Sequence, residues 1–332
     1  MKALFVETPG RVEVKEIDEP IVREDEVLVK PSLVGMCGTD LEITDGTIDP
    51  AYVRYPLVLG HEWVGELLDD VGGVASAGDH VVVEGLITCD VCAECLSGHS
   101  NRCTIYDEIG FTRPGAIAER IAVPRRLVHR IDDDVDLANA ALVEPMAVVW
   151  RALTRIPIRS GLTVAVVGDG TVALLATHLV RLFAPSRVVV VGRRRAQRDL
   201  ALVAGADDFV TELPSERFGL VVEAAGNGEA VTAAFTLAGR GAMVILLGLS
   251  PHGTVVEIAP DDLVNNDLIV QGSFSYTHSA WAQVVEMVNE GSLNGSFLVT
   301  HQFSLDRALD ALNTLRGVAE SAGPRGKVAI TL

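Results

Sequence analysis

Short runs of apolar residues, broken by glycine and proline, recur through the first 150 residues of the chain. Runs of about four to eight apolar and β-branched residues, bounded by turn residues, are typical of β-strands. We therefore expect a β-rich region. Its predicted strands are residues 2–6, 27–34, 64–69, 79–84 and 116–123.

The pattern changes between residues 160 and 250, where apolar runs alternate with stretches of helical periodicity at residues 172–182 and 196–204. This alternation is typical of βαβ units around a parallel sheet, and it predicts an α/β fold class with a doubly wound parallel sheet. The expected strands of this sheet are residues 163–167, 187–191, 220–222 and 242–247.

Beyond residue 280 the pattern predicts two amphipathic helices, at residues 280–289 and 305–315, and a last strand at residues 326–332. The chain therefore divides into three segments. Their expected bounds are 1–150, 151–282 and 283–332.

The composition is that of an ordinary globular protein: 332 residues, 48% hydrophobic and 22% charged. The length suits two domains that each bury a core, and disordered, collagen-like and disulfide-stapled classes are excluded. No apolar run approaches the ~20 residues of a membrane helix. Glu7 comes too early for the apolar region of a signal peptide. We expect a soluble, cytoplasmic protein.

The charge is strongly acidic and unevenly placed. The formal net charge is −18, and residues 1–150 hold 28 acidic and 12 basic residues. Such a surface repels nucleic acid and anionic membranes, so neither is expected as a partner, and it mildly attracts cations. Solubility alone also accounts for this charge.

A glycine-rich turn follows the strand predicted at residues 163–167 and runs Gly168-Asp169-Gly170-Thr171-Val172-Ala173 into a helical stretch. The G-x-G-x-x-A form lets the backbone approach a pyrophosphate, which the helix N-terminus then binds. The context of strand, turn and helix favours a dinucleotide site over an ordinary βα turn. The expected cofactor contacts are Gly168, Gly170, Thr171 and Val172.

Arginines follow the next predicted strand, in the sequence Gly192-Arg193-Arg194-Arg195. An Asp or Glu usually stands there to hold the free ribose hydroxyl of NAD. Guanidinium groups can instead clamp a 2′-phosphate, so Gly192, Arg193 and Arg194 indicate NADP(H) rather than NAD(H). The alternative is that these arginines form a solvated helix start, with Arg195 as a bystander.

Four of the five cysteines are crowded into one segment with the spacing of a metal site. In a cytoplasmic protein such crowding favours metal binding over disulfides. Four thiolates suit a closed, tetrahedral structural zinc, with an iron–sulfur cluster as the alternative. The predicted ligands are Cys89, Cys92, Cys95 and Cys103.

The fifth cysteine, Cys37, precedes Gly38-Thr39-Asp40, and His61 and Glu62 follow 24 residues later. Taken with the motifs above, the whole chain resembles the zinc-containing medium-chain dehydrogenase/reductase family, and within it the sorbitol, glucose and aminocyclitol dehydrogenase branch. The resemblance rests on the segments CGTD (37–40), GHE (60–62), VEPMAV (143–148), GDGTVA (168–173) and GKVAITL (326–332), and on the four-cysteine segment.

The resemblance implies a GroES-like catalytic domain at residues 1–150 that carries both zinc sites, a Rossmann domain at 151–282 and a return segment at 283–332 that completes the first domain. It also implies an enzyme that transfers hydride between the carbinol carbon of an alcohol or polyol and NAD(P). Two zinc ions per chain, one catalytic and one structural, are expected.

Within the catalytic site, the resemblance makes Cys37 and His61 zinc ligands, with Glu62 or Glu144 as the third. Thr39 would relay the substrate proton, and Asp40 would accept from the far nitrogen of His61. The alternatives are a capped turn for Thr39 and Asp40, and a helix-start carboxylate for Glu144.

Further cofactor contacts follow from position in the family pattern. Lys327 matches a basic residue that reaches the pyrophosphate, Gly226 and Gly248 end later strands beside the nicotinamide, and Ser273 begins a loop over it.

The expected substrate is a cyclitol, aminocyclitol, sugar alcohol or sugar, a preference that the bulky Trp63 and the acidic first half of the chain support. A simple secondary alcohol and an amino-acid alcohol such as threonine come next. A zinc-free quinone or enoyl reductase and a non-catalytic NADPH sensor are the competing classes. A homodimer or homotetramer is expected, paired through strands around residues 254–258 and 267–272.

Overall fold

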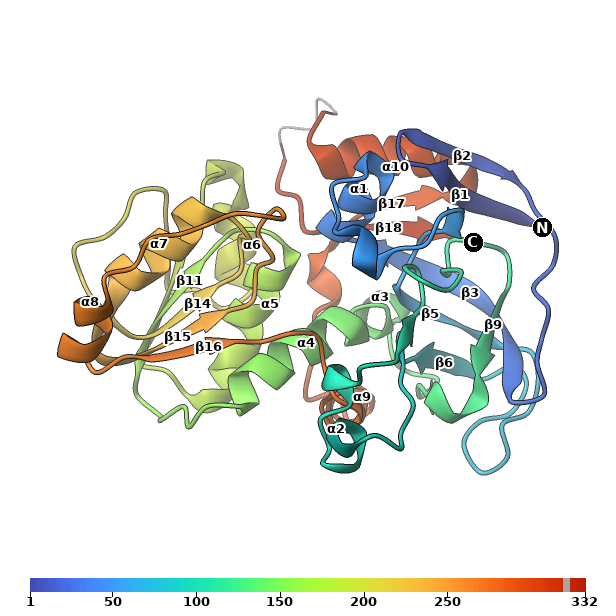
Figure 1. The fold of residues 1–332 in the computed structure, drawn as a ribbon, viewed down its shortest axis with the longest axis horizontal. Helices are drawn as coiled ribbons and strands as arrows, with labels where there is room; N and C mark the ends of the chain where they lie inside the picture. The colour runs from blue at the N-terminus through green and yellow to red at the C-terminus, as the bar shows by residue number, and fades with distance from the viewer. Residues whose placement is uncertain (319–322) are drawn as a thin grey trace. The chain divides into compact units, whose positions relative to one another are not determined.

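A computed structural model describes residues 1–318 and 323–332 and divides the chain into two compact units (Figure 1). Unit 1 holds Met1–Glu144, the return of the chain from Tyr276, and Lys327–Leu332. Unit 2 holds Pro145–Ser275 and the described residues of the short stretch that ends at Gly326. The division therefore falls a few residues before the expected bounds of 150 and 282.

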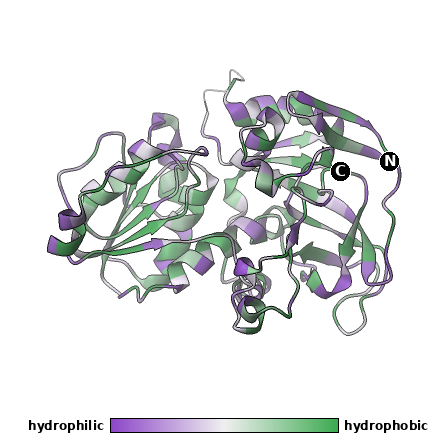
Figure 2. Cartoon of the chain, viewed as in Figure 1, coloured by the Kyte–Doolittle hydropathy of each residue, from purple (hydrophilic) through white to green (hydrophobic). Residues whose placement is uncertain are grey.

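Unit 2 is built on a six-stranded parallel sheet in the order β13-β12-β11-β14-β15-β16. Its strands are nearly continuous apolar runs because a parallel sheet is covered on both faces, and Figure 2 shows this hydrophobic colour along them. Their bounds are β11 Thr163–Val167, β12 Arg187–Val191, β13 Asp208–Val210, β14 Phe218–Glu223, β15 Ala238–Leu246 and β16 Ile269–Gly272.

Helices connect these strands, as the alternating pattern predicts. The bounds of β11 and β12 match the prediction. The helices are α5 (Thr171–Val180), α6 (Arg198–Val203), α7 (Gly228–Leu237) and α8 (Pro260–Asn265). The first helix, α5, starts directly at the glycine-rich turn, so its N-terminus lies at the carboxyl end of the sheet, where nucleotides bind in such folds.

Unit 1 has a seven-stranded sheet in the order β10-β6-β5-β3-β18-β17, with β9 also paired to β3. A smaller sheet has the order β2-β1-β4, and β7 pairs with β8. The bounds are β1 Lys2–Thr8, β2 Arg11–Glu16, β3 Glu26–Met36, β4 Leu57–Val58, β5 Glu62–Leu67, β6 His80–Val83, β7 Leu86–Ile87, β8 Asp107–Glu108, β9 Ile121–Pro124, β10 Val128–Arg130, β17 Val299–Ser304 and β18 Lys327–Thr331.

The end of the chain completes unit 1. The last strand, β18, pairs antiparallel with β3, with Val328 opposite Met36 and Ile330 opposite Val34. These side chains join one apolar core. The helices of the unit are α1 (Gly38–Asp45), α2 (Ala93–Leu96), α3 (Leu137–Ala140), α9 (His278–Asn289) and α10 (Ala308–Arg316), and α4 (Val143–Thr154) begins in it.

Two predicted strands are wrong in whole or in part. Residues 254–258 lie outside every strand and are mostly exposed, because among the described residues no neighbouring strand pairs with them. The segment predicted at 116–123 is a strand only from Ile121, since Ala116 and Ile117 run as a loop whose N–H groups donate to the carbonyls of Gly60 and Leu59. Among the described residues, no helix has the length and apolar character to cross a bilayer.

Candidate active site and metal centres

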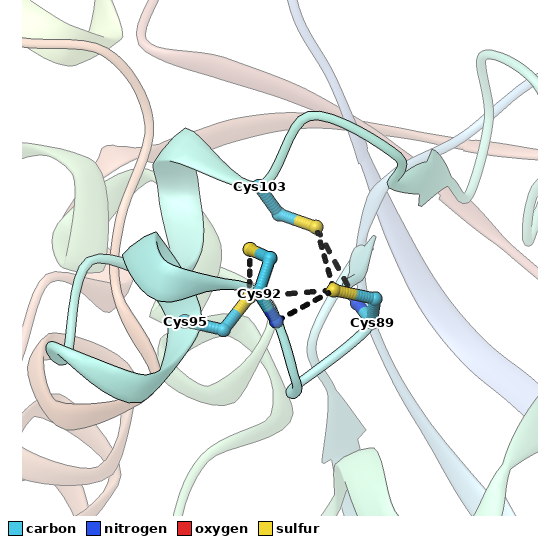
Figure 3. Close-up of side chains that lie close together, drawn as sticks. All are labelled: Cys89, Cys92, Cys95 and Cys103. Carbon is cyan, nitrogen blue, oxygen red and sulfur yellow. Dashed lines mark hydrogen bonds between the residues drawn. The ribbon is translucent and has the colours of Figure 1, made fainter.

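Four cysteine side chains converge in unit 1 on the loop that carries α2 (Figure 3). Their sulfur atoms all lie within 4.8 Å of one another, and every cysteine is a free thiol. The Sγ–Sγ distances include 3.4 Å for Cys92–Cys95, 3.5 Å for Cys103–Cys89 and 4.0 Å for Cys89–Cys95. Zinc–sulfur bonds of ~2.3 Å in a tetrahedron set the sulfurs ~3.8 Å apart. The predicted residues therefore fit a tetrahedral metal ion.

The Cys89 thiol loses its proton more readily than an ordinary cysteine. Backbone N–H groups of Val91 and Cys92 donate toward its sulfur and lower its pKa to about 6. Hydrogen bonds to the charged form favour a thiolate, which is the form that binds a metal.

A second group of metal-binding side chains also lies in unit 1. Cys37 is the N-cap of α1, and its sulfur accepts from the backbone N–H of Thr39 at 3.3 Å. Its Sγ lies 3.1 Å from Nε2 of His61, which stands just before β5. The ligand atoms of Cys37, His61 and Glu62 all lie within 4.8 Å of one another. A soft thiolate, an imidazole and a carboxylate with this spacing are a zinc donor set.

Asp40 lies behind this group and is fully buried. Its Oδ2 accepts from the backbone N–H of Cys37 at 2.8 Å, and its Oδ1 lies 3.7 Å from Nδ1 of His61. Burial raises the pKa of Asp40. Burial lowers the pKa of His61, but the charges of Cys37 and Asp40 outweigh it, so this pKa is well above its usual range. These charges favour a bound cation.

Glu62 is paired with a residue from the end of the chain. The ammonium of Lys327 donates to its Oε2, and both side chains are buried. Gly35 lies so close to this pair that it has no room for a side chain, since a Cβ on it would lie 2.7 Å from Glu62 Oε2. Lys327 was expected at the pyrophosphate of a cofactor. In the structure its ammonium is held by Glu62 inside unit 1.

Glu144 lies in the first turn of α4 and is not among the three side chains that converge on the site. Burial, and then the charge of Glu62, raise its pKa to about 8. Of the two carboxylates proposed as the third ligand, Glu62 is therefore the one whose oxygen lies beside Cys37 and His61.

A loop that sequence reasoning missed packs on His61. The Phe111 ring lies 4.9 Å from the His61 ring, and a Cβ at Gly110 would lie 3.2 Å from His61 Cβ. Glu108, at the end of β8, interacts electrostatically with His61 and Glu144, and burial raises its pKa to about 7. Among the described residues its carboxylate has no ion-pair or hydrogen-bond partner. No motif marks Glu108, which is placed by the pairing of β8 with β7 and by the loop that follows.

The glycine-rich turn of unit 2 has the expected geometry. Gly168 has a φ of 129°, and a Cβ on it would lie 3.1 Å from Ala224 C. Gly170 is the N-cap of α5 and has no side chain to bond the first N–H groups of Thr171 and Val172. These groups remain open to an anion, so this turn fits a pyrophosphate.

At the end of β12 the chain has no room for the acidic side chain that NAD-binding proteins carry there. A Cβ at Gly192 would lie 2.6 Å from the Phe209 ring and 2.8 Å from Asp169 Cβ. Asp169 itself accepts from the backbone N–H groups of Arg193 and Arg194, at 2.9 and 2.8 Å. It also pairs with the Arg194 guanidinium at 2.8 Å. Arg193 is exposed.

The later strand ends of unit 2 also approach each other closely. Gly226 has a φ of 68°, and a Cβ at Gly248 would lie 2.2 Å from Gly226 N. The buried Glu223 accepts from the backbone N–H groups of Ala225 and Gly226, both at 2.8 Å. Sequence reasoning missed this carboxylate. The hydroxyl of Ser273 is buried and has no hydrogen-bond partner among the described residues.

Comparison with known families matches both parts of the chain. The alcohol dehydrogenase GroES-like domain matches residues 23–133. The zinc-binding dehydrogenase domain matches residues 171–290. The sorbitol dehydrogenase of Bacillus subtilis (strain 168) is 29% identical over 329 residues, covering 94% of this chain and 92% of that protein.

Solved structures also share the fold over the whole chain. A putative zinc-binding dehydrogenase of Sinorhizobium meliloti 1021, bound to NADP, has a TM-score of 0.90 and 29% identity, covering 100% of this chain and 99% of that one. The Escherichia coli CFT073 short chain alcohol dehydrogenase RspB, complexed with NADH, has a TM-score of 0.90, 25% identity and the same coverage. With its two zinc-type donor sets and its glycine-rich turn, the chain belongs to the zinc-containing medium-chain alcohol and polyol dehydrogenase family.

Proposed function

We propose that this enzyme transfers hydride between the carbinol carbon of a cyclitol, aminocyclitol, sugar alcohol or sugar and NADP(H), at a catalytic zinc held by Cys37, His61 and a carboxylate. The observation that carries the proposal is the convergence of Cys37, His61 and Glu62 within 4.8 Å, with the Glu108 carboxyl group in electrostatic interaction with His61. The zinc donors would hold the metal ion, and the carboxyl group of Glu108 can form hydrogen bonds with the polar groups of a substrate.

When bound, zinc supplies Lewis acidity toward the substrate oxygen, and NADP+ accepts the hydride. The residues of the chain prepare the site for this chemistry. Asp40 faces Nδ1 of His61 and favours a proton there, which leaves Nε2 free to bind the metal. Thr39, two residues after Cys37, is proposed to carry the substrate proton to solvent through its hydroxyl.

The third ligand is proposed to be Glu62, with Glu144 as the alternative. Lys327 neutralises part of the charge of Glu62, so the site can hold a thiolate and a carboxylate together. The second zinc is proposed at the four cysteines, where sulfur spacings of 3.4–4.0 Å suit a single ion better than a cluster, whose thiolates bind different iron atoms.

The substrate class rests on the charge around the site. Glu108 and Glu144 have no ion-pair partner among the described residues, and an amine or several hydroxyl groups of a substrate can bond to their carboxyl groups. Trp63, which suggested an aminocyclitol from the sequence, is instead buried in the core of unit 1. The preference for polyhydroxylated or aminated substrates therefore rests on Glu108.

The preference for NADP(H) rests on residues of this chain, because the two solved structures described above carry different cofactors. The close contact of Gly192 with Phe209 leaves no space for an acidic side chain at the end of β12. Arg193 and Arg194 follow at once. An absent carboxylate and adjacent guanidinium groups favour a 2′-phosphate.

The assembly is proposed to be a homodimer or a dimer of dimers. The edge strand β16 exposes 49% of Ile269 and 42% of Val270, and an exposed apolar edge is a surface for pairing with a second copy. The strand predicted at 254–258 has no part in this proposal.

The test is the initial rate of NADP+ reduction by zinc-loaded protein with neutral polyols, cyclitols and their aminated counterparts. Turnover of a polyol or cyclitol above simple secondary alcohols and threonine supports the proposal. A higher rate with a secondary alcohol or with threonine would establish the alternative alcohol or amino-alcohol activity. Tight NADPH binding without turnover of any alcohol or ketone would indicate a sensor instead.

A further inference from the structure

A buried glutamine ties the last part of the chain to the glycine-rich turn of unit 2. The Nε2 of Gln197 donates to the carbonyl of Asp169 at 2.6 Å and to the carbonyl of Arg325 at 2.8 Å. Its Oε1 accepts from the backbone N–H of Arg325 at 2.6 Å. Gln197 is only 1% exposed. The backbone of Arg325 is therefore held beside the turn, although the two lie far apart in sequence.

The guanidinium of Arg194 is held on one edge only. Its Nε donates to Asp169 Oδ1 at 3.1 Å, and its Nη2 donates to the same oxygen at 2.8 Å and to the Asp169 carbonyl at 3.0 Å. Nη1 has no partner among the described residues. A guanidinium fixed by a carboxylate in this way presents its remaining N–H groups in a set direction.

The side chain of Arg325 lies within electrostatic range of both members of this pair. Burial, and then the charge of Arg194, lower the pKa of Arg325, and the charge of Asp169 partly offsets them. Both guanidinium groups therefore interact electrostatically with Asp169, and the exposed Arg193 is next to Arg194 in the chain. Guanidinium groups gathered in this way attract an anion.

We propose that Arg325 and Arg194 together bind the 2′-phosphate of NADP(H), with Asp169 and Gln197 as the residues that position them. This inference rests on the proposed use of NADP(H). Arg194 follows the end of β12, where the adenosine ribose binds in this fold, and Gly192 leaves that place without an acidic side chain. The hydrogen bonds of Gln197 hold the backbone of Arg325 near the same turn. This role differs from the one expected of Lys327, which was a contact with the pyrophosphate.

The experiment measures binding rather than turnover, by calorimetric titration of the zinc-loaded protein with 2′,5′-ADP, 5′-ADP, NADPH and NADH. For Arg325→Gln we expect about a tenfold rise in Kd for 2′,5′-ADP and NADPH, because a charge-assisted hydrogen bond is lost. The Kd for 5′-ADP and NADH should stay within about twofold. Arg194→Gln should show the same selectivity, and Gln197→Leu a weaker form of it.

Arg240→Gln is the matched control, because Arg240 is exposed at the start of β15, at the opposite end of the sheet. It changes the net charge equally and should leave every Kd unchanged. Equal weakening of NADPH and NADH by Arg325→Gln would place Arg325 at the pyrophosphate and overturn the proposal, as would no change in any Kd. If the unchanged protein binds NADH as tightly as NADPH, the NADP(H) preference fails first, independently of Arg325.

Discussion

The ammonium of Lys327, the first residue of the last strand, lies on the carboxylate of Glu62, next to His61. The two side chains are 2% and 3% exposed. Because Lys327 is on β18 and Glu62 is on β5, the pairing of the C-terminal strand brings a positive charge to the proposed zinc site. The same contact therefore adjusts the charge of the site and helps to hold the last strand in unit 1.

Replacing Lys327 with Met should destabilise the protein, because it leaves the Glu62 carboxylate buried without its partner. Loss of one member of a buried pair costs about 3–5 kcal/mol. The measurement is urea unfolding of Lys327→Met, Glu62→Gln and the double variant. The double variant should be less destabilised than the sum of the single changes. Additive losses would mean that the pair does not interact.

Replacing Cys95 with Ser should remove one zinc ion per chain and lower the free energy of unfolding, since a closed metal site holds the loop from Cys89 to Cys103. Cys37→Ser should remove the other ion with little loss of stability. Metal analysis and thermal unfolding of both variants check this expectation. A Cys95→Ser protein that keeps two zinc ions, or that is as stable as the parent, would contradict the structural assignment.

The parts of the fold that depend on the local pattern of apolar residues and glycines could be predicted from the sequence. The bounds of β11 and β12 follow from uninterrupted apolar runs, and the glycine-rich turn follows from its own sequence. The two cysteine-containing donor groups were also recognisable, because thiols with metal spacing have few other roles. These features depend on neighbours in the sequence.

The rest depends on contacts between distant residues. Glu62 and Lys327 are 265 positions apart, and Gln197 and Arg325 are 128 apart, so no spacing rule brings either pair together. Glu108 carries no motif, and its place near His61 follows from the pairing of β8 and from the loop after it. Residues 254–258 were wrongly predicted as a strand for a related reason, because alternation alone does not say whether a partner strand exists.

The stability of unit 1 should depend on pH through His278, at the start of α9. The Glu84 carboxylate accepts from His278 and from His129, and this contact raises the pKa of His278. Burial raises the pKa of Glu84, but the two histidines outweigh it and the pKa is lowered. The stabilisation by protonated His278 is full below its unfolded pKa of about 6.5 and is lost as pH rises through its raised folded pKa.

Glu84 sets a lower pH limit, because its contribution to stability is full above an unfolded pKa of about 4.3 and is lost as the pH falls through its lowered folded pKa. His278→Gln should therefore cost most stability near pH 5.5 and least near pH 9 in urea unfolding. His301→Gln is the control, since His301 has no carboxylate partner among the described residues. An equal loss at both pH values would contradict the ionised pair.

Gly192→Asp, the change that would normally direct such a site toward NAD(H), should instead destabilise unit 2. The new Cβ would lie 2.6 Å from the Phe209 ring, and the carboxylate would add to Asp169 beside it. We expect a lower unfolding midpoint and weaker binding of both cofactors. The companion variant Gly192→Asp with Phe209→Leu relieves the contact, and it should recover stability. A stable single variant with tight NADH binding would show that the backbone opens at this point.

Replacing Glu108 with Gln should change substrate choice rather than the chemical step. Gln keeps the size and the hydrogen-bonding capacity of the side chain, so neutral polyols should keep their kcat/KM within about threefold. An aminated substrate loses a charge-assisted hydrogen bond, and its kcat/KM should fall about tenfold through KM. The measurement is the ratio of kcat/KM for an aminated and a neutral cyclitol in the parent and in Glu108→Gln.

Glu119→Gln is the matched control for this experiment. Glu119 accepts from the backbone N–H of Lys2, and its removal changes the net charge equally at an exposed position away from the site. The control should leave the ratio unchanged. If Glu108→Gln lowers kcat for both substrates equally, Glu108 acts on the reaction through His61 or Glu144, and substrate recognition by its carboxylate is excluded.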